Sequence, residues 1–333
     1  MNGIVREAGR SDNVNLGSPR PEELAKIVLT IRSPPGHSAI MKSQTGRLLF
    51  LSGAFSLLLC AQLRAELMFG TNGTSITRFD TLSLGTTTTV TLTGLQGGET
   101  IVGIDLRASS NIALNGVLYG VGSSNRLYII DPFTGVATQV GTAGLFSLSG
   151  TAFGTDFNPV PDRIRQVSNT EQNLRLNPDD ATLSGNDPAL NPAGNVVAVA
   201  YSNNDFNPGT GTTLYAIDSV TGTLGIITVP NSGGPITIVG SLGLGTNLNE
   251  NIGFDITATG AAFASITVGG QSRLYSINLA TGAATNLGLI GTGMTSYLGL
   301  TGGTAPIPEP STYALLAAGA LALGFRRFRR TKK

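Results

Sequence analysis

Carboxylates and arginines are the only strongly charged side chains between residues 66 and 304 of this 333-residue chain. This stretch holds 15 Asp and Glu residues and seven Arg residues, so its formal net charge is −8, although the whole chain is near neutral at +1. It contains no His, Cys or Lys, because His37 and Cys60 precede it. Nucleophilic catalysis by Ser-His-Asp or Cys-His and zinc sites built from Cys and His are therefore excluded. The lack of Lys excludes a phosphate-binding loop, and the acidic balance argues against nucleic-acid binding.

Oxygen-bearing side chains in the middle of this stretch offer ligands for a hard cation. Calcium binds six to eight oxygens from carboxylates, amides and backbone carbonyls. We take as candidate calcium ligands Asp156, Asn158, Asp162, Asp179 and Asp180. Their spacing does not match an EF-hand loop. The sequence indicates no cofactor other than calcium.

The same acids have two other interpretations. Two carboxylates at a fixed separation can catalyse glycoside hydrolysis, but a sequence does not specify that separation. Asp156 and Asp162 can instead cap turns and form ion pairs with Arg163 or Arg165. We favour this structural role and assign no catalytic residue.

Repeated strand-turn-strand segments must position these side chains. The segments 127–141, 214–224 and 274–288 each begin Leu-Tyr-x-Ile, which alternates between two faces as a β-strand does, and continue with Asp/Asn-x-x-Thr-Gly, a turn sequence. Each segment is therefore a predicted β-hairpin. Weaker copies near residues 76–80 and 174–179 extend the series at intervals of roughly 40 to 60 residues, which is the length of one propeller blade.

The predicted fold class is all-β, a β-propeller of five blades. The strand at 296–301 has no blade of its own, and we expect it to complete the first blade and close the ring. A β-sandwich or a β-solenoid of similar hairpins is the alternative. Tyr128, Tyr215 and Tyr275 share one place in the repeat, where they either pack between blades, which we favour, or line a sugar-binding face.

Both ends of the chain carry patterns of export. Residues 1–40 are polar and predicted to be a disordered upstream extension, with translation starting at Met41. Residues 41–65 have the positive start and apolar run of a signal peptide, for which a buried core helix is the alternative. The propeller domain spans 66–304, and residues 305–333 contain a short apolar helix that can enter a membrane. Four arginines hold its end in the cytoplasm: Arg326, Arg327, Arg329 and Arg330.

The order Pro308-Glu309-Pro310, apolar helix and basic end resembles the PEP-CTERM sorting signal of Gram-negative bacteria. The resemblance implies export, transient anchoring in the inner membrane, and processing near this motif by an exosortase-type enzyme. Members of this group are cell-surface or extracellular proteins linked to exopolysaccharide and biofilm. A plain C-terminal anchor is the alternative.

The segment 154–177, with its Thr-Asp-Phe-Asn-Pro and Asn-Leu-Arg elements, resembles a bacterial family of domains of unknown function that often carry PEP-CTERM tails. This resemblance implies a propeller-like fold and no activity. We therefore expect a non-enzymatic matrix or binding protein, with a polysaccharide hydrolase or lyase as the alternative.

Overall fold

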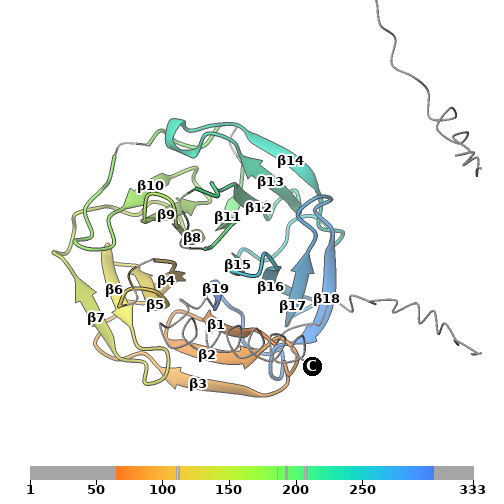
Figure 1. Cartoon of the computed structure of the whole chain (residues 1–333). Helices are drawn as coiled ribbons and strands as arrows, with labels where there is room; N and C mark the ends of the chain where they lie inside the picture. The colour runs from red at the N-terminus through yellow and green to blue at the C-terminus, as the bar shows by residue number, and fades with distance from the viewer. Residues whose placement is uncertain are drawn as a thin grey trace, which may run out of the picture. The chain divides into compact units, whose positions relative to one another are not determined.

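The computed structural model describes residues 65–303 except 110, 112, 186, 192, 193, 206 and 208, and all of these belong to one compact unit. They form β-strands and one 3-10 turn, η1 (Pro230–Ser232), with no α-helix among them. The strands make five antiparallel sheets arranged around a central axis (Figure 1). The prediction of an all-β, five-bladed propeller is confirmed for this part of the chain.

The strands of each blade follow one another from the axis outward. Blade one contains β19 (Gly299–Gly302), β1 (Leu67–Thr71), β2 (Ser75–Asp80) and β3 (Thr87–Thr91). Blade two contains β4 (Ile101–Arg107), β5 (Val117–Gly122), β6 (Arg126–Ile130) and β7 (Ala137–Val140). Blade three contains β8 (Phe153–Asn158), β9 (Arg163–Ser168) and β10 (Asn173–Leu176). Blade four contains β11 (Val196–Tyr201), β12 (Leu214–Asp218), β13 (Thr223–Ile227) and β14 (Ile236–Ser241). Blade five contains β15 (Ile252–Ile256), β16 (Ala262–Val268), β17 (Gln271–Ile277) and β18 (Ala284–Leu289).

The ring is closed by the last strand, as predicted. β19 pairs antiparallel with β1, which places Thr301 opposite Phe69 and Leu300 opposite Gly70. The Tyr297 ring covers Gly70 so closely that a Cβ there would lie 2.7 Å from it. Both ends of the domain thus share one blade, and the sandwich and solenoid alternatives are wrong.

Blade three has three strands, whereas each of the other four blades has four. After β10 the described chain makes a single bridge between Leu176 and Leu183, and no fourth strand joins the sheet. The segment after β10 contains Pro178 and Pro188, which have no backbone N–H to donate to a ladder.

Apolar side chains fill each of the five interfaces between neighbouring blades. Tyr128 packs with Phe69 and Ile76 of blade one, and Tyr275 packs with Ile217 and Leu224 of blade four. The other interfaces have similar clusters. Because no blade buries both faces alone, this packing is what stabilises the ring. The interpretation of Tyr128 and Tyr275 as residues between blades is confirmed, and the half-buried Tyr215 packs against the same cluster as Tyr275.

The hairpin turns form as predicted. The Asp131 carboxylate accepts a hydrogen bond of 2.8 Å from the Phe133 N–H, and Gly135 follows with φ 79°. A Cβ on Gly135 would lie 2.2 Å from the Thr91 carbonyl oxygen, so this turn also needs Gly for its approach to blade one.

The predicted extension, signal peptide and C-terminal helix, with residues 308–310 and the four arginines after the helix, lie outside the described residues, apart from Ala65. Within residues 65–303, apart from the seven gaps, no helix has the length and apolarity to cross a bilayer.

Candidate functional site

The five candidate calcium residues do not gather into one site. Asp162 and Asp179 both contact the guanidinium of Arg107. Asn158 and Asp180 cap turns, accepting hydrogen bonds from the N–H groups of Val160 and Thr182. Asp156 is buried on the inner strand β8, which ends at Asn158.

Arg107 holds Asp162 and Asp179 on a buried guanidinium. Its Nε donates to Asp162 Oδ1 at 2.8 Å, and its Nη1 donates to Asp179 Oδ1 at 2.8 Å and to the Tyr119 hydroxyl at 3.2 Å. Burial opposes the charge, but these hydrogen bonds outweigh it and raise the pKa of Arg107. The ion-pair partner predicted for Asp162 was therefore wrong: Arg163 reaches only backbone carbonyls.

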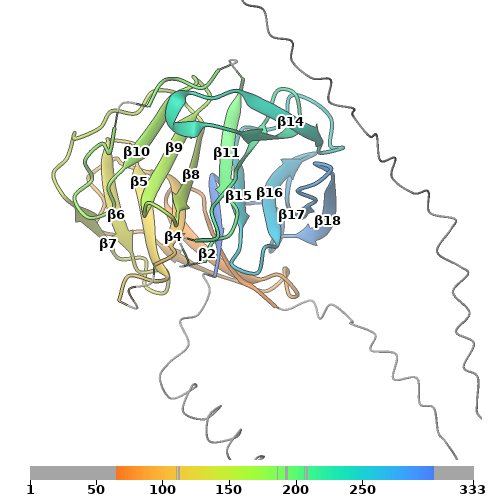
Figure 2. The same cartoon turned by 45° about the horizontal axis from the view of Figure 1, so that its top comes forward.

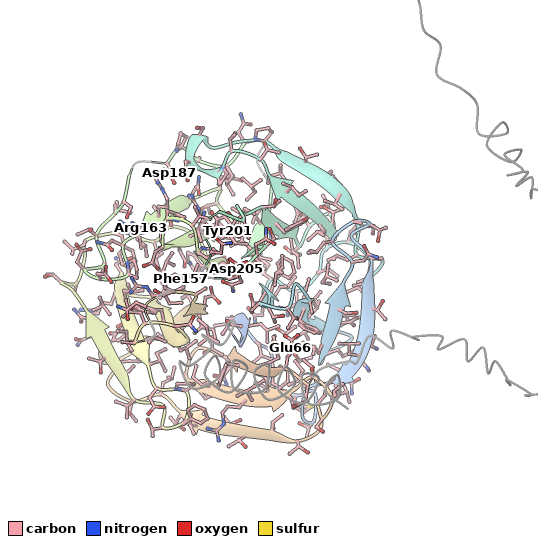
Figure 3. All side chains as sticks on the ribbon, viewed as in Figure 1. Glu66, Phe157, Arg163, Asp187, Tyr201 and Asp205 are labelled. Carbon is pink, nitrogen blue, oxygen red and sulfur yellow. The ribbon has the colours of Figure 1, made fainter. Side chains whose placement is uncertain are left out.

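Arg165 forms a second buried ion pair, with Asp187 instead of Asp156 or Asp162. Its Nη1 lies 2.6 Å from Asp187 Oδ2, and Arg175 binds the other oxygen of the same carboxylate at 2.8 Å. Three neutral oxygens complete the contacts of Arg165: Asn173 Oδ1, Asn231 Oδ1 and the Tyr201 hydroxyl. In Figure 3, Asp187 lies farther from the axis than Tyr201. The prediction that Arg165 pairs with Asp156 or Asp162 was wrong because its guanidinium is directed outward.

Asp156 instead belongs to a group of three carboxylates at the axis. The three are equivalent residues of inner strands: Asp105 on β4, Asp156 on β8 and Asp255 on β15. Each follows a Gly by two residues, in the triplets Gly103-Ile104-Asp105, Gly154-Thr155-Asp156 and Gly253-Phe254-Asp255. The other two inner strands carry Thr301 and Ala200 at this place.

Glycine brings the inner strands together below the carboxylates. A Cβ on Gly154 would lie 2.8 Å from the backbone of Ala198 in blade four, and one on Gly253 would lie 2.6 Å from Leu300 in blade one. Residues two apart share a face of a strand, so each Asp points toward the same next blade as its Gly. Figure 2 shows β8, β11 and β15 side by side in this arrangement.

Each of the three carboxylates links its own inner strand to the inner strand of the next blade. Asp105 accepts from the Phe157 N–H at 2.6 Å, Asp156 from the Tyr201 N–H at 2.7 Å, and Asp255 from the Gly302 N–H at 2.5 Å. Each donor directly follows the residue of the next blade that is equivalent to the Asp, because Phe157, Tyr201 and Gly302 follow Asp156, Ala200 and Thr301. Figure 3 shows Phe157 and Tyr201 close to the axis.

Thr301 continues the ring of hydrogen bonds. Its hydroxyl accepts from the Leu106 N–H at 3.2 Å and donates to Asp105 Oδ1 at 2.6 Å. Ala200 has no polar side chain, so β11 offers no equivalent link to β15.

The three carboxylates lack any basic partner. None of the ion pairs found among the described residues includes Asp105, Asp156 or Asp255. Burial raises the pKa of Asp105 to about 6, although the Thr301 hydroxyl opposes the shift. Burial, followed by the neighbouring carboxylates, raises the pKa of Asp156 and Asp255 well above the ordinary value.

Two oxygens of this group receive no hydrogen bond from any N–H or hydroxyl group. These are the buried Asp156 Oδ1 and Asp255 Oδ1. Asp156 and Asp105 can share one hydrogen bond between their side chains, but only when one of the two carboxyls is protonated. Buried polar atoms are almost always paired, so such atoms need an explanation. Asp105 and Asp255 were not among the predicted site residues. The recurrence of Asp two residues after Gly in three inner strands was the signal that could have found them.

A cleft lies between blades five and one, away from the axial carboxylates. It has a volume of about 890 Å³, and its lining includes Leu82, Phe263, Ser276, Asn278 and one acid, Glu66. None of the candidate calcium residues lines it.

Comparison with known proteins assigns the chain to a family. The family described as Domain of unknown function (DUF4394) matches residues 75–301, which is most of the propeller. The chain belongs to the DUF4394 family. The DUF4394 domain is followed by a PEP-CTERM protein-sorting motif at residues 306–330. The motif marks this DUF4394 chain for export, transient membrane anchoring and processing by an exosortase-type enzyme, as predicted.

Solved structures resemble the DUF4394 domain only remotely. Virginiamycin B lyase from Staphylococcus aureus is 11% identical over 73% of this chain and 71% of its own, with a TM-score of 0.36. A putative 6-phosphogluconolactonase from Bacteroides uniformis is 14% identical over 68% and 83%, with a TM-score of 0.36. A protein of unknown function from Bacteroides thetaiotaomicron is 13% identical over 71% and 63%, with a TM-score of 0.39. Likenesses this remote assign no activity to the DUF4394 domain. No curated protein matches its sequence.

Proposed function

We propose that this exported DUF4394 protein is a non-enzymatic binding or matrix module at the cell surface or outside the cell, with exopolysaccharide as its ligand. The observation that carries the proposal is that its central acids are buried or paired with arginine. Asp105, Asp156 and Asp255 are buried acceptors between blades, and Asp162 and Asp179 are paired with Arg107. A glycosidase needs two carboxylates free to reach the substrate.

The cleft between blades five and one supports a neutral polysaccharide as the ligand. The exposed side chains of Leu82 and Leu287 offer apolar contact for the faces of sugar rings, and Ser276 and Asn278 offer polar groups for sugar hydroxyls. No Arg lines the cleft and Glu66 adds a negative charge, which disfavours an anionic ligand.

The test incubates the full chain, purified in a mild detergent, with the producer's own exopolysaccharide. We expect co-sedimentation with the polymer and no change in its length by size-exclusion chromatography. Leu82 is 53% exposed and lies in the cleft, so Leu82→Arg should weaken co-sedimentation at least tenfold.

Val220→Arg is the matched control, because Val220 is 48% exposed and lies outside the cleft lining. It should bind the polymer as the unchanged protein does. Shortening of the polymer would overturn the non-enzymatic function and favour the hydrolase or lyase alternative.

A further inference from the structure

We propose that the axis of the propeller binds one calcium ion between the carboxylates of Asp105, Asp156 and Asp255. This site goes beyond the proposed function and is independent of it, because none of its residues lines the cleft between blades five and one.

The separation of the carboxylates fits one shared ion. Asp105, Asp156 and Asp255 each offer an oxygen, and these oxygens lie within 4.8 Å of one another. Calcium binds oxygens at about 2.3–2.6 Å, so two of its ligands can be at most about 5 Å apart. Three independent strands therefore place their oxygens inside the span of a single coordination sphere.

The unpaired oxygens are a second observation that points to a ligand. Asp156 Oδ1 and Asp255 Oδ1 are buried without a hydrogen-bond donor, whereas the Oδ2 atoms of both residues accept backbone N–H groups. A carboxylate that serves only to join two blades needs one acceptor oxygen. Asp255 Oδ1 is therefore left for a cation, and so is Asp156 Oδ1 once the proton that Asp156 can share with Asp105 has been released.

The charge around the axis also favours a cation. The five inner strands contribute to this level Asp105, Asp156, Ala200, Asp255 and Thr301. Glu66, just before β1, adds repulsion at Asp255. The buried guanidiniums of Arg107 and Arg165 are held by other acids. Buried carboxylates without a basic partner are neutralised by protons or by a metal ion.

The ligand type selects the metal class. Carboxylate oxygens, with the Thr301 hydroxyl beside them, suit a hard cation, and residues 66–304 contain no His or Cys to bind zinc. Calcium tolerates irregular geometry, and three carboxylates on separate strands need that tolerance more than the octahedron that magnesium demands.

The experiment uses the full chain in mild detergent, stripped with EDTA and passed into chelator-free buffer at pH 7. Isothermal titration with calcium chloride should give one ion per chain, and elemental analysis after dialysis should give the same ratio. The melting temperature should rise with the calcium concentration. No heat and no change in melting temperature would overturn the proposal, as would binding of magnesium in preference to calcium.

Asp255→Asn is the variant that tests the ligands. Asn keeps an oxygen to accept from the Gly302 N–H but loses the negative charge, so the ring of hydrogen bonds can persist. We expect its calcium affinity to fall at least tenfold, with a cooperative melt retained in EDTA. Unchanged affinity in this variant would overturn the proposal.

Asp131→Asn is the matched control, because Asp131 caps an exposed turn and Asn serves there equally well. It should keep the full calcium response. If Asp255→Asn does not fold, Asp156→Asn and the titration of the unchanged protein decide the question in the same way.

Discussion

Two buried polar regions of this propeller differ in whether their charges are paired. Around Arg107 and Arg165, each guanidinium is covered by oxygens, including at least one carboxylate. At the axis, Asp105, Asp156 and Asp255 lie together, and none of them forms an ion pair with a basic side chain of the described residues. In the first region, acidic and basic side chains of the protein neutralise each other's charges. In the second region, the negative charges are neutralised only by added protons or an added metal ion.

The difference separates acids whose charge is already paired with arginine from acids that can still bind a proton or a metal ion. Asp187 has both oxygens bound by arginines, so its charge already has partners. Asp255 uses one oxygen to hold blade one and leaves the other unpaired. The axis is therefore the region in which a bound proton or metal ion should change the stability of the protein.

The largest effect is expected for Arg165→Met. The change leaves Asp187 with Arg175 alone and three neutral acceptors unpaired, and both Arg165 and Asp187 are at most 2% exposed. Breaking a buried ion pair from one side costs about 3–5 kcal/mol. Urea unfolding should show this loss. The partly exposed Arg273, which donates to Gln271 on its own strand, provides the control Arg273→Met, with a change within about 0.5 kcal/mol.

The pH dependence of stability in EDTA should be the next largest effect. The folded protein holds protons at the axis that the unfolded chain releases near the ordinary Asp pKa, because Asp105 has a pKa of about 6 and burial raises the pKa of Asp156 and Asp255 well above the ordinary value. The stability that these protons contribute is fully present below about pH 4, and the part from Asp105 is lost as the pH rises through about 6. A shift of about two pKa units at Asp105 alone corresponds to roughly 3 kcal/mol.

Denaturant melts at a series of pH values measure this trend, and calcium at pH 7 should restore the lost stability. In Asp255→Asn the decline with pH should be shallower, because one charge is removed. A stability that rises from pH 4 to pH 8 in EDTA would show that the axis does not hold these protons.

Arg107→Met should cost less than Arg165→Met. Its partners Asp162 and Asp179 are 32% and 63% exposed, so water can solvate them once the guanidinium is gone. We expect a loss of about 2 kcal/mol, because the Tyr119 hydroxyl also loses its buried partner. An equal or larger loss than in Arg165→Met would contradict the ranking by exposure. The double variant Asp162→Asn with Asp179→Asn should reproduce part of the effect.

The smallest of these effects is expected for Thr301→Val. Val keeps the shape of Thr but removes the hydroxyl that joins the Leu106 N–H to Asp105. Leaving that buried N–H unpaired should cost about 1–2 kcal/mol in EDTA. The pKa of Asp105 should also rise, because the Thr301 hydroxyl bonds the charged form. Differential calorimetry at pH 5 and pH 7 would measure both changes, and Thr301→Ser, which keeps the hydroxyl, is the control.

Much of the architecture followed from local patterns. Alternation in the Leu-Tyr-x-Ile strands and the turn chemistry of Asp131 and Gly135 depend on residues within a few positions of each other, so they were predictable. The missing fourth strand of blade three was not predicted, although Pro178 and Pro188 were visible. The calcium ligands inferred from nearness in sequence were placed apart, and of the five only Asp156 joins the carboxylates at the axis.

The amino-acid sequence by itself determined the strand period, the hairpin turns, the five-fold repetition and the export motif, because each of these is written in short segments. Only the tertiary structure decided which charged groups meet. Arg107 of blade two pairs with Asp162 and Asp179 because blades two and three pack side by side. Asp255 of blade five meets Asp105 and Asp156 because the closed ring brings the inner strands together at the axis. Both kinds of contact depend on how blades pack around the axis, which no single repeat contains.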